Sequence, residues 1–443
     1  VRALVLDGAY DDDFDPFARD AAGALARSWT TLCRRAGTCP NISQDIRAFA
    51  EQLAAEPIDG VGIDGAGRRR RVHVTDADFA QLLYDASYTF TIYRDVPAAI
   101  EAWRDGDAAP FLRLAAEDLG SGGSGSARSY SEGLYAAVAC HDYPTIWDRS
   151  GTLEERRAQL DEAIAALPED AFAPLPNSAW LGSGYEYQLV HGCLGWPEPE
   201  PGVDDAPMPT LVPHPDLPVL VLNGEFDITT PVANARTAAR AWPNATFVEV
   251  ANEIHITALY DSEGCASSIV RRFIRTLDAG DTSCAGRTPQ IHVVEAFPGT
   301  AATAPEAASE RGDGSTASDR RTAWVVAEAV GDALTRWWNV TYRGGVGLRG
   351  GSFSTQGPYF SDTRPLVVTF RDARFADDVA IDGRVVWLRP SGAVRGTLRV
   401  DAPGGDGIVH LRATSRGPTR PGTLTGTIAG RPLLVSVPNL WSP

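Results

Sequence analysis

The 443-residue sequence predicts an α/β protein that carries a large helical insert and a β-rich C-terminal domain. Two nearly continuous apolar runs support the α/β prediction: residues 1–6, VRALVL, and residues 217–222, LPVLVL, each of which is followed by a turn with glycine. Such runs are typical of strands that are buried on both faces of a parallel sheet. Between residues 217 and 279, strand patterns alternate with helical patterns, which also favours a parallel sheet.

The helical insert separates the two parts of the predicted core. Segments such as SQDIRAFAEQLAA and LEERRAQLDEAIAAL space their apolar residues as amphipathic helices do, and Thr75 stands where it can cap a helix. The four arginines at positions 68–71 are interpreted as an exposed turn. We therefore expect a partial α/β core in residues 1–10 and 205–287, and a helical cap in residues 11–204.

The C-terminal third has a different pattern. Residues 288–319 lose all periodicity after Phe297 and are rich in small and polar residues, so we expect a linker. Residues 320–443 begin with one helical segment, RRTAWVVAEAVGDALTRWW, and continue with short strand-like runs separated by Gly, Pro and Asp. This alternation predicts a mainly antiparallel β domain, to which the sequence assigns no role.

Composition excludes several classes of protein. A formal charge of −17 disfavours nucleic acid as a partner, because phosphate binding needs a basic surface. No run approaches the roughly 20 apolar residues that span a bilayer. We find no motif for a cofactor and no Cys or His spacing for zinc. Six cysteines without metal spacing favour disulfides in an oxidising compartment over buried thiols, and six cysteines allow fifteen pairings.

Two residues stand where catalytic groups collect in α/β proteins. Asp227 follows a predicted buried strand in LVLNGEFDITTP, and His255 follows the next strand in TFVEVANEIH. Functional groups gather at the carboxyl ends of such strands. An Asp and then a His, one strand–helix unit apart, are the second and third members of a Ser-Asp-His triad. The alternative is that Asp227 caps a turn and His255 is an ordinary loop residue.

Neighbouring polar residues offer weaker candidates. Asp7 and Glu225 also lie at strand ends and can face the same cleft, although turn capping is the simpler role for both. His141, which lies between Cys140 and Asp142, suggests a thiol nucleophile, but a disulfide at Cys140 would leave no thiolate to attack.

The C-terminal part of the α/β region resembles the secreted tripeptidyl-aminopeptidase-like serine hydrolases, which are relatives of the prolyl iminopeptidases. The residues that carry the resemblance are VLVLNGEFDITTPVANARTAARAWPNATFVEVANEIH and the following CASSIVRRFIRTLDAGDTSCAG. Five shorter segments are similar to the family's upstream part: VLDG, LLYDASY, RDGDAAPFLRLAAE, AVACHD and CLGWP. The resemblance covers residues 1–287 and implies an α/β-hydrolase fold, in which residues 1–6 form the strand after the nucleophile-bearing unit.

The resemblance implies roles for individual residues. Asp227 would be the triad acid and His255 the general base. The implied disulfides pair the cysteines as neighbours along the chain: Cys33 with Cys39, Cys140 with Cys193, and Cys265 with Cys284. They imply a secreted or cell-envelope protein, although no signal peptide is present in these residues. One departure lies in the residues before His255, where the family often has a glycine and this chain has Asn252-Glu253-Ile254.

The nucleophile is the second departure. The family places its serine in a G-x-S-x-G elbow, and no such motif occurs in the 443 residues; GSGGSGSARS and GGSFSTQG fail the spacing and are interpreted as loops. We therefore expect a C-terminal portion of a serine hydrolase that is inactive without an N-terminal segment that completes the core. Its expected substrate is a peptide cleaved near its N-terminus. The alternatives are an esterase acting on a small ester, and a non-catalytic binding module.

Overall fold

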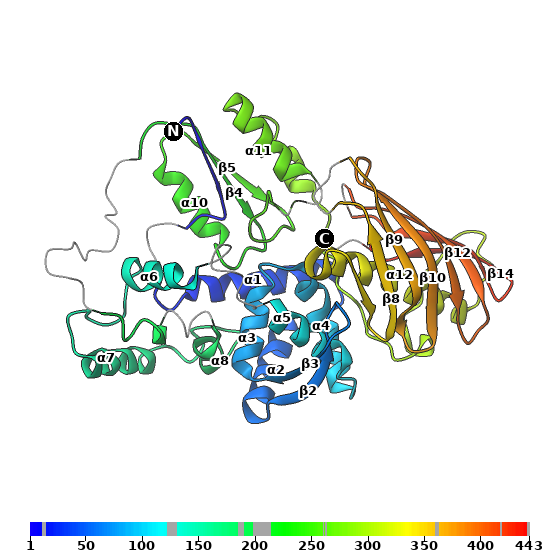
Figure 1. Cartoon of the computed structure of the whole chain (residues 1–443), viewed down its shortest axis with the longest axis horizontal. Helices are drawn as coiled ribbons and strands as arrows, with labels where there is room; N and C mark the ends of the chain where they lie inside the picture. Colours follow the sequence, from blue (N-terminus) through cyan, green and yellow to red (C-terminus); the bar gives the residue numbers. More distant parts are fainter. Residues whose placement is uncertain are drawn as a thin grey trace.

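The computed structural model describes residues 1–10, 15–121, 131–184, 190–197, 214–259, 261, 264–358, 363–416 and 419–440. Figure 1 shows a small parallel sheet near the N-terminus, a group of helices beside it, and a large curved sheet at the far end of the molecule. The helices in these ranges include none whose length and apolar character would suit a membrane crossing.

The parallel sheet has three strands in the order β1 (Leu4–Asp7), β4 (Val219–Gly224) and β5 (Ala245–Val250). Leu6 pairs with Val221 in a parallel register, so the two apolar runs of the sequence lie side by side. Helices cover both faces of β4. The side chains of Val219 and Val221 pack on α10 (Val232–Ala241), and those of Leu220 and Leu222 pack on α11 (Cys265–Thr276). This arrangement confirms the prediction of an α/β fold with a parallel sheet.

Eight helices and one hairpin lie between β1 and β4 among the described residues. They are α1 (Arg19–Ala36), α2 (Ile42–Ala55), β2 (Ile58–Ile63), β3 (Arg69–Val74), α3 (Asp76–Asp85), α4 (Phe90–Arg104), α5 (Ala109–Ser121), α6 (Glu132–Asp142), α7 (Leu153–Ala165) and α8 (Asn177–Gly182). Thr75 caps α3 as expected: its hydroxyl accepts from the Asp78 N–H, while the Asp78 carboxylate accepts from the Thr75 N–H.

The β2–β3 hairpin is a correction to the sequence analysis, which expected an exposed turn at residues 68–71. Three of those arginines lie in β3, and the turn precedes them. Asp64 organises the turn, because its Oδ1 accepts from the N–H groups of Ala66 and Arg68 and its Oδ2 accepts from the Arg68 Nε at 2.8 Å. The Asp64 carboxylate accepts hydrogen bonds from the backbone N–H groups of the turn. The turn is thereby stabilised, and the arginines that follow it can continue as strand β3.

The C-terminal region is a nine-stranded sheet that curves around one long helix, α12 (Ala317–Arg336), which continues as a π-helix, Trp337–Thr341 (Figure 1). The strand order is β6-β14-β13-β12-β11-β10-β9-β8-β7 and every pairing is antiparallel. The strands are β6 (Ala308–Ser309), β7 (Gly344–Gly347), β8 (Gly350–Gln356), β9 (Leu366–Ala376), β10 (Val379–Leu388), β11 (Ala393–Asp401), β12 (Gly407–Thr414), β13 (Gly422–Ile428) and β14 (Arg431–Val437). This confirms the predicted antiparallel β domain.

The stretch expected to be a linker, residues 288–319, is packed against the rest of the protein. Val293, Val294 and Phe297 are buried, and the Val294 N–H donates to the Arg94 carbonyl at 2.9 Å. Farther along, the short strand β6 pairs with β14. The segment lacks periodicity because scattered apolar residues, rather than one face of a helix or strand, provide its buried contacts. The division of the chain into domains therefore stays a proposal.

A buried charge cluster joins the helical region to α12. Arg94, Arg113 and Arg336 pair with four carboxylates, each pair having at least one N–O distance of 3.5 Å or less. The carboxylates belong to Asp95, Glu117, Glu328 and Asp332, and all seven side chains are at most 5 % exposed. Because the arginines and acids come from α4, α5 and α12, the cluster holds these helices together.

Candidate active site

Asp227 and His255 meet at the carboxyl edge of the parallel sheet. Asp227 lies in the loop after β4, His255 lies in the loop after β5, and the Asp227 Oδ2 is 2.9 Å from the His255 Nδ1. The Asp227 side chain is fully buried, while 13 % of the His255 side chain is exposed. A hydrogen bond from Nδ1 to the carboxylate leaves the other ring nitrogen, Nε2, as the proton acceptor of the neutral imidazole.

Three donors fix the Asp227 carboxylate. The Thr230 N–H donates to Oδ1 at 2.7 Å, and the Thr230 hydroxyl donates to Oδ2 at 2.6 Å. The third donor is the hydroxyl of Ser87, which lies 3.3 Å from Oδ1. A carboxylate held in this way orients the imidazole and stabilises its protonated form.

The end of β1 lies directly beneath His255. Gly8 has φ +75°, and a Cβ atom there would stand 2.8 Å from the His255 Cε1 and 2.9 Å from its Nδ1. Asp7, the preceding residue, accepts the N–H groups of Thr257 and Ala258 at 3.0 and 2.8 Å. Burial raises the pKa of Asp7, and these backbone donors oppose that rise. The Asp-Gly pair that ends the first strand therefore shapes the His255 loop.

The turn before His255 is stabilised from several sides. Asn252 has φ +57°, a left-handed conformation that asparagine tolerates better than most residues and that glycine adopts freely. The Asn252 N–H donates to Glu225 Oε2 at 3.0 Å, and Arg35 donates both to Glu225 and to the Asn252 Oδ1. Burial acts against ionisation of Glu225, but Arg35 and the Asn252 N–H hold its pKa below its usual value. Asp7 and Glu225 thus stabilise turns around the site.

Residues 85–88, DASY, bring the helical region into the site. The Ser87 hydroxyl accepts from the N–H groups of Ile228 and Thr229, and its carbonyl accepts from the His255 N–H at 3.0 Å. Tyr88 packs its ring edge against the imidazole with a centroid distance of 5.3 Å. DASY belongs to LLYDASY, one of the segments in which the chain resembles the serine hydrolases. Nothing in its residue types alone indicates that a buried serine contacts both Asp227 and His255.

A cavity of about 650 Å³ begins beside Tyr88. Asn339, Val340 and Tyr342, which follow α12, contribute to its lining. The charged residues of the lining are four acids from the hairpin turn, α3 and α5 and one base that pairs with the first of them: Asp64, Asp85, Glu117, Asp118 and Arg68. Burial and the neighbouring Asp85 charge raise the pKa of Asp118 to about 8, and burial raises the pKa of Asp85 to about 6. The two carboxyl groups hydrogen-bond to each other, so they share a proton near neutral pH.

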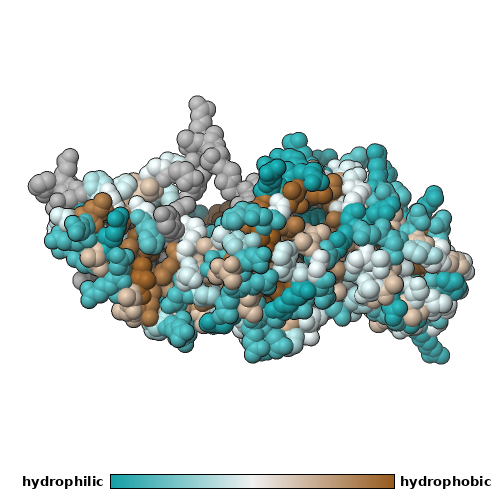
Figure 2. Space-filling view, turned by 90° about the horizontal axis from the view of Figure 1, so that it is seen from below, coloured by the Kyte–Doolittle hydropathy of each residue, from teal (hydrophilic) through white to brown (hydrophobic). Residues whose placement is uncertain are grey.

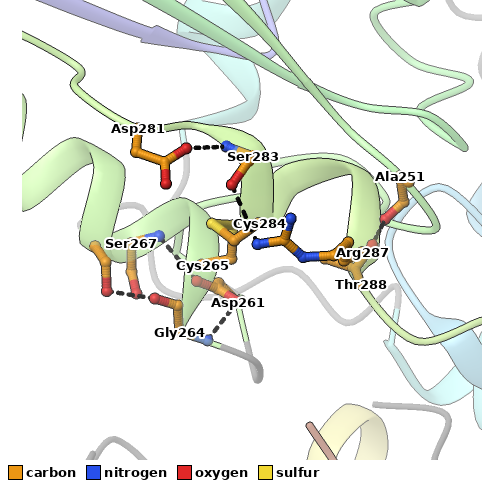
Figure 3. The surroundings of a disulfide bond; sticks show 11 residues. Ala251, Asp261, Gly264, Cys265, Ser267, Asp281, Ser283, Cys284, Arg287 and Thr288 are labelled. Atoms are coloured by element: carbon orange, nitrogen blue, oxygen red, sulfur yellow. Dashed lines mark hydrogen bonds between the residues drawn. A yellow bond between two sulfur atoms is a disulfide. The ribbon is translucent and has the colours of Figure 1, made fainter. Parts of the chain in front are cut away.

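The structure contains three disulfides, Cys33–Cys39, Cys140–Cys193 and Cys265–Cys284, which are the pairs implied by the resemblance. Figure 3 shows the third, which ties the first turn of α11 to a short 3₁₀ helix, Ser283–Arg287. The same helix reaches the His255 loop, because the Ala285 carbonyl accepts from the Ala251 N–H at 2.9 Å. The three disulfides are compatible with a secreted or extracellular protein.

Comparison with known proteins agrees with the fold around this site. No curated protein and no solved structure gives a significant match to the chain. Residues 178–284, which include β4, Asp227, β5, His255 and α11, match the α/β-hydrolase family model described as TAP-like protein. That match, together with the parallel sheet, supports the assignment of this part of the chain to an α/β-hydrolase family and suggests a hydrolase- or peptidase-related function.

Proposed function

We propose that the protein is part of a secreted serine hydrolase that releases single residues or short peptides from the N-terminus of its substrates. The observation that carries this proposal is the Asp227–His255 pair, which lies at the carboxyl ends of neighbouring parallel strands with a 2.9 Å hydrogen bond to Nδ1. In the described structure no hydrogen bond reaches the His255 Nε2, so this nitrogen can act as a general base.

The nucleophile in this proposal is a serine outside the 443 residues. The sequence has no G-x-S-x-G motif, and among the described residues β1 pairs with a strand on one side only. The side chains of Leu4, Val5 and Leu6 are only partly buried. A further parallel strand beside β1 would cover this edge, and the loop at its carboxyl end would come close to Gly8 and His255.

The reaction then follows from the geometry. His255 Nε2 takes the proton of the serine hydroxyl while the hydroxyl oxygen attacks the carbonyl carbon, and it returns the proton to the leaving amine. Water then hydrolyses the acyl-enzyme by the same route. Asp227 orients the imidazole and stabilises the imidazolium that forms in each step.

The acidic cavity supports an aminopeptidase within the hydrolase class. A peptide whose scissile carbonyl lies at His255 can pass Tyr88 and place its α-ammonium group beside Asp85 and Asp118. Glu117, which is 8 % exposed and lines the same cavity, has one carboxylate oxygen without a hydrogen-bond partner. Asn339, Val340 and Tyr342 also line this cavity, and in the proposal they limit how far a peptide extends, as the removal of short N-terminal pieces requires.

The catalytic pair is tested by labelling the product of the complete gene with a fluorophosphonate probe. We expect Asp227→Asn and His255→Ala to lower the labelling rate by about 10³- to 10⁴-fold, because both remove the activation of the serine. The chain offers a matched control in the exposed pair of Asp59 and His73, whose Oδ1 and Nδ1 are also 2.9 Å apart. Asp59→Asn and His73→Ala should keep full labelling. Labelling that survives His255→Ala, or is absent from the unaltered protein, would reject the serine-hydrolase mechanism.

A further inference from the structure

The exposed face of the C-terminal sheet carries a group of arginines on three adjacent strands. Arg384 lies on β10, Arg395 and Arg399 on β11, and Arg412 on β12, and all four side chains point away from α12 into solvent. The residues between them along each strand, such as Leu398 and Leu411, are buried against the core. We call the four arginines the arginine face. His410 lies among them, with its Nδ1 3.0 Å from the Thr397 hydroxyl.

Repulsion between the arginines of the arginine face lowers the stability of the protein when no ligand is bound. Arg395 and Arg412 are direct cross-strand partners, and like charges in that position destabilise a sheet. Arg384 stands opposite Thr397, diagonally between Arg395 and Arg399. In the described part of the structure none of the four arginines forms an ion pair. Asp382 faces Arg399 in the register and Asp401 follows it on the same face, so Arg399 has acidic neighbours. The cross-strand partners of Arg384, Arg395 and Arg412 include no acidic residue, so the positive charge is concentrated at these three arginines.

This charge is opposite to that of the molecule as a whole. Residues 366–437 contain ten arginines and six acidic residues, whereas the complete chain has 40 basic and 57 acidic residues. The curved sheet forms the end of the molecule farthest from β4 and β5 (Figure 1). Because charges separated by more than about 8–10 Å are largely screened at physiological salt, a ligand at this end would meet mainly the local positive charge.

We propose that the arginine face binds an anionic polymer whose repeating units carry phosphate groups. Neighbouring strands lie about 5 Å apart and alternate residues about 7 Å apart along a strand, so successive phosphates of an extended polymer can each meet a guanidinium group. The planar guanidinium donates two parallel hydrogen bonds to phosphate oxygens. None of the four arginines lines the cavity beside Tyr88 or any of three smaller cavities of the described structure, which favours an extended polymer over a small anion in a pocket.

Other occupants fit less well. A second copy of the chain joined by a twofold axis through the arginine face would bring like charges together. Single-stranded nucleic acid uses exposed aromatic side chains for base stacking, and the outward positions of β10, β11 and β12 carry none. Figure 2 shows mostly hydrophilic and intermediate residues at the end of the molecule formed by the sheet, so the face visible there offers no broad apolar contact.

The test measures binding of long-chain inorganic polyphosphate to the 443-residue protein by fluorescence anisotropy at several salt concentrations. We expect Arg395→Glu with Arg412→Glu to weaken binding by more than about tenfold and to reduce the slope of log K against log salt by about 1.5–2, since two phosphate contacts are lost. The matched control is Arg157→Glu with Arg275→Glu, which changes the net charge equally at exposed positions elsewhere.

Thermal unfolding of Arg412→Glu distinguishes a loss of polyphosphate binding from a loss of folding. This substitution places opposite charges across β11 and β12, so the variant should unfold at the same or a slightly higher temperature while it binds polyphosphate less tightly. Three outcomes would overturn the proposal: no binding by the unaltered protein, equal weakening in the control variant, or equally tight binding of poly-L-glutamate, which would indicate an acidic protein partner. Each is independent of the Asp227–His255 mechanism, because neither pair of substitutions touches that site.

Discussion

At the residue scale, the candidate site depends on small groups that accept close contacts. Gly8 can lie against the imidazole of His255 because it has no side chain. A Cβ atom at this position would occupy the space of the ring. Ser87 is fully buried and hydrogen-bonds to Asp227, so the helical region and the parallel sheet meet at one hydroxyl group. The geometry of the catalytic pair is therefore set by residues that have no chemical role of their own.

Gly8→Ala should displace His255, and the chain supplies a control at an equivalent backbone position. Gly8 and Gly37 both have φ +75°, but a Cβ at Gly37 would meet no atom within 4 Å. Gly37→Ala should cost about 1 kcal/mol of unfolding free energy from its backbone conformation alone. Gly8→Ala should cost about 1–3 kcal/mol more, because the added methyl group overlaps the ring.

The measurement is urea unfolding of both variants, with the His255 ring signals followed by NMR. We expect the His255 signals to shift in Gly8→Ala and to stay in place in Gly37→Ala. Equal losses of stability in the two variants would show that His255 does not occupy the position described.

At the scale of helices and strands, the sequence predicted the elements whose pattern is local. The sequence predicted Val219–Leu222 as a buried strand because each of its residues is apolar, and Thr75 as a cap because it stands directly before a helical pattern. The β2–β3 hairpin was not predicted because Arg69–Arg71 are charged, and a run of charged residues is not a typical strand pattern. The contacts of Asp64 with the preceding turn, which allow the strand to form, are visible only in the structure. Ser87, Arg94 and Arg336 were missed for another reason: each has at least one partner more than 130 residues away in the sequence, which are Asp227, Glu328 and Asp95 respectively.

The pairing of α3 with α5 through Asp85 and Asp118 should make stability depend on pH. The folded-state pKa of Asp118 is about 8 and its ordinary value is 3.8, so between these pH values the folded protein binds a proton that the unfolded chain has lost. Stability therefore falls as pH rises from about 4 to about 8, by up to about 1.4 kcal/mol per pH unit for one proton.

Asp118→Asn should remove most of this dependence. We expect the variant to match the unaltered protein near pH 4, where Asp118 is protonated, and to be more stable by a few kcal/mol at pH 8. Urea unfolding at four or more pH values measures the difference. Parallel pH profiles for the two proteins would contradict the shared proton.

At the scale of the whole molecule, the helical region and the C-terminal sheet behave as one structural body. Their apolar side chains form one continuous core, from Phe17 near the N-terminus to Leu440 near the C-terminus. The charge cluster lies within this body, and His292 adds a further contact, with its Nε2 2.7 Å from Glu328. The C-terminal domain therefore supports the wall of the acidic cavity directly.

Arg336→Met should destabilise the whole body. Arg336 contacts Asp95, Glu117 and Asp332 at 2.6–3.0 Å, so its loss leaves three buried carboxylates with fewer partners and should cost about 3–5 kcal/mol. Arg19→Met, which breaks a pair with Asp15 on the surface, should cost less than about 1 kcal/mol. Calorimetry should show one transition moving to lower temperature; separate melting of the C-terminal sheet would contradict a shared core.

The buried charge cluster also restricts which substitutions the protein can accept during evolution. Three arginines pair with four carboxylates in the interior, and His292 adjoins Glu328, so any single replacement removes a partner from at least one buried charge. A lineage that changes these positions one by one would pass through poorly folded proteins. We therefore expect homologous genes to keep all seven residues together or to have replaced them as a set with apolar residues, so that the cluster marks how long the cap and the C-terminal domain have evolved as a unit.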